Sequence, residues 1–167
     1  MLGKTTNPIL QKTEQAIEAK VKPEQKAAFQ KIIAAGLKLM YADKMRAGVT
    51  KSLKEGGDPA QIVGDGVAKL LGIMMNQSKG TMPMQAAVPA ATILLCEGLD
   101  FVEQAGVVKV DSNVLATAMQ EMNSSFMQLL GVTPEKLQAM MQKAKTSAAP
   151  ATQPAKPSGL IAAAQGA

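Results

Sequence analysis

Three carboxylates have the one spacing in this sequence that suits acid–base or metal chemistry. Glu97, Asp100 and Glu103 are three residues apart, so a helix would place them close together on its surface. Carboxylates paired in this way can exchange protons with a substrate or bind Mg²⁺. Apolar residues such as Leu95 and Leu99 fall between them. We therefore expect the carboxylates to form the solvated face of an amphipathic helix instead of a catalytic or metal site.

The residue types that the sequence lacks exclude most other chemistry. It contains no His, no Trp and one Cys among 167 residues. Without His there can be no Ser–His or Cys–His dyad and no zinc site of the His/Cys type. Cys96 follows the apolar run Ile93-Leu-Leu, where a thiol behaves as a small buried hydrophobe. We predict a protein that is not an enzyme, needs no cofactor or metal, and has no small-molecule substrate.

The apolar content points to assembly with other polypeptides. Hydrophobic residues make up 47% of the chain, but many of them are Ala or Met and only four residues are aromatic. Small side chains bury little area, and burial stabilises by roughly 25 cal/mol per Å². We therefore expect a thin core that must be completed by close approach of helix to helix or by partner subunits, most simply in a homo-oligomer.

Charge is distributed unevenly along the chain. Residues 1–55 carry eleven basic and five acidic groups (+6), residues 56–135 three and eight (−5), and residues 136–167 four and none (+4). This pattern favours contacts with a charged partner or between copies, although a solvated basic face would look the same. Non-specific contact with a DNA backbone is one such case, because base readout and stacking residues are scarce. The candidates for phosphate contact are Lys38, Lys44, Arg46 and Lys51.

Helix signals recur along the chain, and they predict an all-α bundle of about five to six helices over residues 1–145. A Pro/Ala-rich, low-complexity tail is expected to follow over residues 146–167. Only residues 106–110 look like a strand. The helices are expected at 8–21, at 23–54 with a bend near Gly48, at 58–76, from Pro89 to Gly106, at 111–131, and from Thr133 onwards.

Small residues recur at every fourth position of the predicted helix 58–76. They are Ala60, Gly64, Ala68 and Gly72, which together we call the small-residue ridge. Residues four apart form a ridge on a helix, and a flat ridge lets a second helix approach closely. The partner helix can belong to the same subunit or to a neighbouring one, and the sequence leaves both alternatives open.

Residues 80–96 form the longest uncharged stretch. At this length, with two prolines, it is shorter than the roughly 20 residues of a membrane span. We expect a buried central helix, with a membrane-facing role in some other state as the alternative. Its candidate residues are Met82, Met84, Val88, Ile93, Leu94 and Leu95. The tail ends in a second apolar element, Gly159, Leu160 and Ile161, which we expect to anchor it on a neighbouring copy.

The Ala/Met-rich helices, the segment Met82–Glu103 and the tail closing on Gly-Leu-Ile give the chain a likeness to a known class. It resembles the small internal virion, or ejection, proteins of short-tailed bacteriophages. The resemblance implies an α-helical subunit that is made in the cytoplasm and stored in the capsid near the portal. It further implies release ahead of the DNA and reassembly with other virion proteins into a conduit across the host envelope. No catalytic residues carry over.

Two functions therefore compete. The first is a non-enzymatic virion subunit that oligomerises into a conduit for DNA and associates transiently with membranes. The second is a soluble helical adaptor or chaperone-like module whose Met-rich grooves hold a partner helix, because flexible thioethers suit adaptable surfaces.

Overall fold

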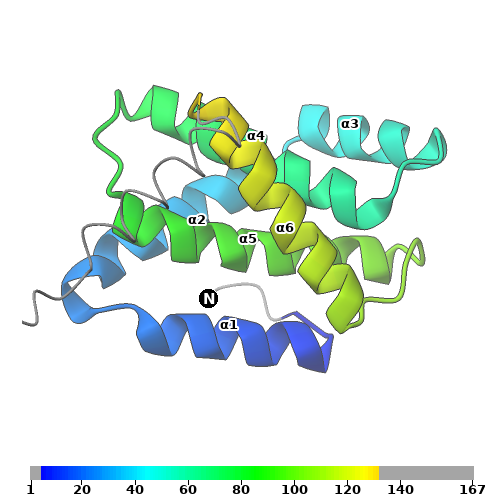
Figure 1. Cartoon of the computed structure of the whole chain (residues 1–167), viewed down its shortest axis with the longest axis horizontal. Coiled ribbons are helices and arrows are strands. Elements are labelled where there is room, and N and C mark those ends of the chain that lie inside the picture. Colours follow the sequence, from blue (N-terminus) through cyan, green and yellow to red (C-terminus); the bar gives the residue numbers. More distant parts are fainter. Residues whose placement is uncertain (1–4, 132–167) are drawn as a thin grey trace, which may run out of the picture. The chain divides into compact units, whose positions relative to one another are not determined.

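Six α-helices and one 3₁₀ turn make up the computed structural model over residues 5–131, the part of the chain that the structure describes (Figure 1). They are α1 (Pro8–Lys20), η1 (Pro23–Gln25), α2 (Lys26–Met40), α3 (Asp43–Lys54), α4 (Pro59–Gln77), α5 (Met84–Gln104) and α6 (Ser112–Leu129). The predicted all-α bundle is confirmed for these residues. The predicted helix after Thr133, the tail 146–167 and its anchor Gly159–Ile161 lie outside them.

Polar side chains fix three of the helix starts. The side chains of Asn7, Asp58 and Asp111 accept hydrogen bonds from backbone N–H groups in the first turns of α1, α4 and α6. Proline occupies the first position of α1 and of α4, where its missing N–H has no partner to lose. These starts coincide with those expected from the sequence.

The prediction of one long helix over 23–54 is wrong, because α2 ends at Met40 and a separate helix, α3, begins at Asp43. Tyr41 closes α2, and Ala42 adopts an extended conformation that redirects the chain into α3. Gly48, where a bend was expected, lies inside α3. The apolar side chains before and after Tyr41 point in different directions because they belong to two separate helices, α2 and α3, and not to one bent helix.

The central helix, α5, contacts α1, α2, α4 and α6. Figure 1 shows α1 running along one side of α5 and α6 crossing it. Helix α5 begins at Met84, earlier than the start expected at Pro89, which lies inside it. Every residue from Ala90 to Asp100 is buried, so α5 forms the centre of the core.

Small residues let the helices approach α5 closely. A Cβ atom on Gly36 of α2 would clash with the Leu94 side chain, and one on Gly98 of α5 would lie 2.8 Å from Val63 Cγ1. Branched side chains from the neighbouring helix therefore fill the space that the glycines leave. The described residues of one chain form a continuous hydrophobic core in this way. Close approach of the helices, one of the two ways in which we expected a thin core to be completed, therefore operates within the subunit.

The segment 106–110 connects α5 to α6 and forms no strand in the described structure. Gly106 adopts a φ of +72°, and the Val107 N–H donates to the Val102 carbonyl, which closes the end of α5. Val110 is buried, and its N–H donates to Glu103 Oε1 over 2.9 Å. The Glu103 side chain thus accepts the backbone hydrogen bond of Val110, in a segment whose sequence looked like a strand.

Candidate functional site

The small-residue ridge on α4 faces α6 of the same chain. A Cβ atom on Gly64 would lie 2.5 Å from the Ala118 carbonyl oxygen, and one on Gly72 would lie 3.4 Å from Leu129 Cδ1. Ala60 and Ala68 are buried as well. The ridge therefore mediates close packing inside the subunit, which is one of the two alternatives that the sequence left open. Contacts between copies need another surface, because α6 covers this one.

The uncharged segment divides into a buried and an exposed half. Ile93, Leu94 and Leu95 are almost inaccessible to solvent. Nearer its start the side chains are half-buried or exposed, namely those of Met82, Met84 and Val88. Among the described residues, α5 is the one helix long and apolar enough to cross a membrane, and 78% of its most apolar window is buried. The core helix of a soluble protein passes the same test of length and composition, so this finding does not distinguish a core helix from a membrane span.

The three carboxylates do not form a solvated face, so that prediction is wrong. Glu97 is 6% exposed and Asp100 is 4% exposed, while Glu103 is half-buried. The reason is that α1 and the residues leading into it lie over this face of α5, where water was expected. The alternating charge and apolar pattern could not reveal this cover.

The segment that leads into α1 is held by these carboxylates. Asp100 Oδ1 accepts hydrogen bonds from Thr6 N over 2.7 Å and Thr6 Oγ1 over 2.9 Å, and its Oδ2 accepts one from the Gln104 side chain. The Asn7 amide nitrogen Nδ2 donates to Glu103 Oε2 over 2.8 Å. Neutral donors, instead of cations, thus bind the carboxylates and attach the start of α1 to α5.

Two carboxylate oxygens in this cluster are buried without a hydrogen-bond partner. They are Glu14 Oε1 on α1 and Glu97 Oε1 on α5. Burial raises the pKa of Glu14 to about 7, and the charges of Glu97, Glu18 and Asp100 raise it further while the Thr5 hydroxyl lowers it. Burial, followed by the charge of Asp100, also raises the pKa of Glu97. No group of carboxylates among residues 5–131 has the arrangement of a metal site.

Cys96 is completely buried beside this cluster. Burial, and then the charges of Glu14 and Glu97, raises the pKa of its thiol to about 12. The thiol therefore stays protonated near neutral pH, and its prediction as a structural hydrophobe is confirmed.

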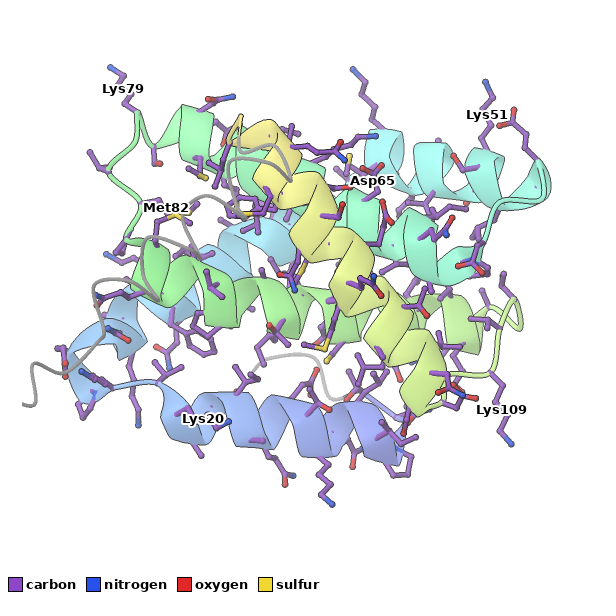
Figure 2. The ribbon with its side chains drawn as sticks, viewed as in Figure 1. Lys20, Lys51, Asp65, Lys79, Met82 and Lys109 are labelled. Atoms are coloured by element: carbon purple, nitrogen blue, oxygen red, sulfur yellow. The ribbon has the colours of Figure 1, made fainter. Side chains whose placement is uncertain are left out.

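The candidate phosphate contacts lie on the surface around α3. Lys44, Arg46 and Lys51 belong to α3, Lys38 belongs to the end of α2, and all four are exposed. Figure 2 shows Lys51 projecting from α3 away from the bundle. Lys51 also forms an exposed ion pair with Glu55 at 3.8 Å. The structure thus gathers three of the four predicted residues on one short helix.

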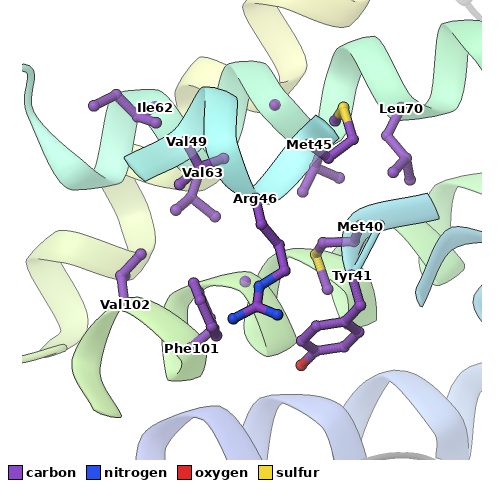
Figure 3. A pocket seen from close by; sticks show the side chains of 13 residues that line it. Met40, Tyr41, Met45, Arg46, Val49, Ile62, Val63, Leu70, Phe101 and Val102 are labelled. Carbon is purple, nitrogen blue, oxygen red and sulfur yellow. The ribbon is translucent and has the colours of Figure 1, made fainter. Parts of the chain in front are cut away.

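An apolar cavity of about 50 Å³ lies beneath α3 (Figure 3). Helix α3 covers it with Met45, Arg46 and Val49, and the remaining wall comes from the end of α2 and from α4 and α5. The Arg46 guanidinium lies 5.7 Å from the centre of the Phe101 ring, which in turn meets the Tyr41 ring edge-on at 6.2 Å. Burial raises the pKa of Tyr41, as do Glu97 and Asp100, whereas Arg46 lowers it. Such a cavity means that α3 packs incompletely on the bundle.

Sequence reasoning missed both features of this region. The cavity depends on the extended conformation of Ala42, which separates α2 from α3 and brings α3 into contact with α4. The residue types around Ala42 do not predict this separation. The carboxylate cluster depends on residues more than 90 positions apart, since Thr6 and Asn7 bind Asp100. Asn7 accepts a hydrogen bond from Ile9 N at the start of α1 and donates one from Nδ2 to Glu103 on α5, and the second bond could not be predicted from the neighbours of Asn7.

Comparisons with known families, with curated proteins and with solved structures found no match to this chain.

Proposed function

We propose that the chain is a non-enzymatic structural subunit of a phage virion, an ejection protein that oligomerises into a conduit for DNA across the host envelope. It would be stored in the capsid near the portal and would associate with a membrane only after release. The proposal rests on the sequence resemblance described above and on one structural observation.

The supporting observation is the placement of α5. A largely apolar helix of 21 residues is packed against α1, α2, α4 and α6, and most of it is buried. Such a subunit can be stored in water with its apolar helix covered and can later expose that helix to lipid or to other copies. Because α6 covers the small-residue ridge, the first contacts between copies would use apolar residues that are exposed in the folded chain: Ile73, Val88, Leu129 and Leu130.

The direct test is mass spectrometry of purified virions together with an assembly assay. The chain should be present in several copies per particle, and the purified chain should form oligomers and release dye from vesicles. Absence from the virion would reject the proposal. If the chain is present in virions but the purified chain neither forms oligomers nor releases dye, the proposal of a conduit is rejected.

A soluble helical adaptor remains the second candidate function, and the cavity beneath α3 favours it. Met40 and Met45 line this cavity, and flexible thioethers adapt to different partners. An adaptor should purify as a stable monomer or dimer that leaves vesicles intact. Light scattering of the purified chain, combined with the dye-release assay, separates the two functions.

A further inference from the structure

Helix α3 is the least firmly attached helix of the bundle. Every other α-helix of the described residues contributes at least one buried side chain to the core, whereas α3 contributes none. Its apolar stripe, Met45, Val49 and Leu53, repeats every four residues and is only half-buried. The cavity lies directly beneath two of these residues. The contacts that would hold α3 are therefore partly missing.

Both ends of α3 allow it to move as a unit. At its start, Ala42 is extended and no side chain caps the helix. At its end, Glu55 is followed by Gly56, whose φ is +84°, and by Gly57. The interaction of the Arg46 guanidinium with the Phe101 ring of α5 is one that detachment of α3 would break.

The outer face of α3 carries a strong positive charge. Four basic residues and one acidic residue, Asp43, give the twelve residues a net charge of +3. Three of the four cations, Lys44, Lys51 and Lys54, are exposed and free of the cavity, whereas the guanidinium of Arg46 lies over the Phe101 ring. A short helix with one apolar stripe and a cationic face is the type that lies in the interface of an anionic bilayer.

We propose that α3 swings out of the bundle and lies in an anionic lipid surface, with Met45, Val49 and Leu53 in the acyl boundary and its cations among the phosphates. Charge complementarity and the half-buried stripe favour lipid over nucleic acid, because contact with DNA phosphates would leave the stripe unused. The inference rests on the proposed function in one respect, which is that the chain meets a membrane.

The chain contains no Trp, so a single introduced Trp reports on its own surroundings. Val49→Trp places the reporter on the stripe beside the cavity, and Leu53→Trp is a second reporter on the same stripe. Val107→Trp in the loop after α5, at a position that is 44% exposed, is the matched control. Urea unfolding and circular dichroism first establish that each full-length variant folds. The probe is a vesicle of phosphatidylcholine and phosphatidylglycerol in equal parts, with brominated acyl chains that quench Trp.

We expect the vesicles to quench the α3 reporters and to leave Trp at position 107 largely unquenched, with no effect from vesicles of phosphatidylcholine alone. Equal quenching of all three reporters would show that the whole chain inserts, and quenching of none would show that α3 stays in the bundle. Either result overturns the inference.

Charge reversal supplies the second arm. Lys44→Glu with Lys51→Glu should weaken binding to the anionic vesicles at least tenfold, because each cation near such a surface contributes about 1 kcal/mol. Lys12→Glu with Lys20→Glu makes the same charge change at exposed sites on α1 and should weaken binding much less. An equal loss of vesicle binding in the α3 variant and in the α1 variant would overturn the lipid assignment. So would tighter binding of the wild-type chain to duplex DNA than to the vesicles, if only the α3 variant abolishes the DNA binding. Detection of the chain in virions with no quenching would reject this inference alone, whereas absence from virions would reject the proposed function.

Discussion

Gly64 and Gly66 lie two residues apart on α4 and face different surroundings. A Cβ atom on Gly64 would meet the Ala118 carbonyl oxygen at 2.5 Å, whereas one on Gly66 would meet no atom within 4 Å. Gly64→Ala should therefore push α6 away and lower the free energy of unfolding by about 1–3 kcal/mol. Gly66→Ala removes only the helix penalty of glycine and should raise the free energy of unfolding by about 1 kcal/mol.

Urea unfolding of the two variants, followed by circular dichroism, measures both changes. The pair is well matched, since each substitution adds one methyl group to the same helix. Changes of the same sign would mean that α6 does not lie against Gly64 as described.

Glu14 gives the chain a stability that depends on pH. Its pKa is about 7 in the folded chain and 4.5 in the ordinary case. A carboxyl with a raised pKa binds its proton more tightly in the folded state, so the stabilisation is complete below about pH 4.5 and is lost as the pH rises through 7. Between pH 5 and pH 8 the free energy of unfolding should fall by roughly 1–2 kcal/mol, allowing for the solvent that reaches this half-buried group.

Glu14→Gln should flatten that fall, and urea unfolding at pH 5, 6, 7 and 8 measures it. Glu24→Gln, an exposed change in η1, is the control and should leave the slope in place. Glu97 contributes in the same direction, because its pKa is raised too. A slope that survives in Glu14→Gln and disappears only in Glu97→Gln would assign the titration to α5 instead of α1.

At the scale of the elements, α3 offers a test of local stability. Gly48 lies inside α3 with open space around it. Gly48→Ala should therefore stabilise the helix by about 1 kcal/mol and slow hydrogen exchange of its amides about fivefold. Gly56→Ala, at the turn with a φ of +84°, should act in the opposite direction, since an L-residue there costs about 1–2 kcal/mol.

Hydrogen exchange read by mass spectrometry locates both effects. In the wild-type chain, the amides of α3 should exchange before those of α4 and α5. Exchange of α3 as slow as that of α5 would contradict its loose attachment.

Helix starts could be predicted from the sequence where a local signal fixes them. Asn7, Asp58 and Asp111 cap their helices through bonds to residues two or three positions away, so their neighbours reveal them. The break at Ala42 has no such signal, because alanine is a good helix former and tertiary packing decides its conformation. Pro89 gave the opposite error. It is a local signal for a helix start, but in the structure it lies inside α5, which begins at Met84.

The candidate site was predictable only in part. The exposure of Lys44, Arg46 and Lys51 follows from their charge, and the burial of Cys96 follows from its apolar neighbours. The burial of Glu97 and Asp100 could not be predicted, because α1 and the residues leading into it cover them and supply neutral donors from the other end of the chain. The small-residue ridge was recognised, but its partner α6 depends on the tertiary fold.

At the scale of the whole molecule, the proposed conduit requires the bundle to open, because α5 is covered in the folded chain. If opening precedes insertion, the rate of dye release from vesicles should follow the population of the open state. A change of 1 kcal/mol in stability then changes that rate about fivefold. Gly66→Ala should slow the release, and Gly64→Ala should accelerate it.

Both variants keep every charged side chain, so their binding to the vesicle surface should be equal and serves as the internal control. Measuring dye release at matched amounts of bound protein separates opening from binding. Equal release rates from the two variants, despite different free energies of unfolding, would mean that vesicles are permeabilised without exposing α5. In that case the conduit would have to be built from the outer faces of folded subunits, and the exposed apolar residues of α4, α5 and α6 would be its walls.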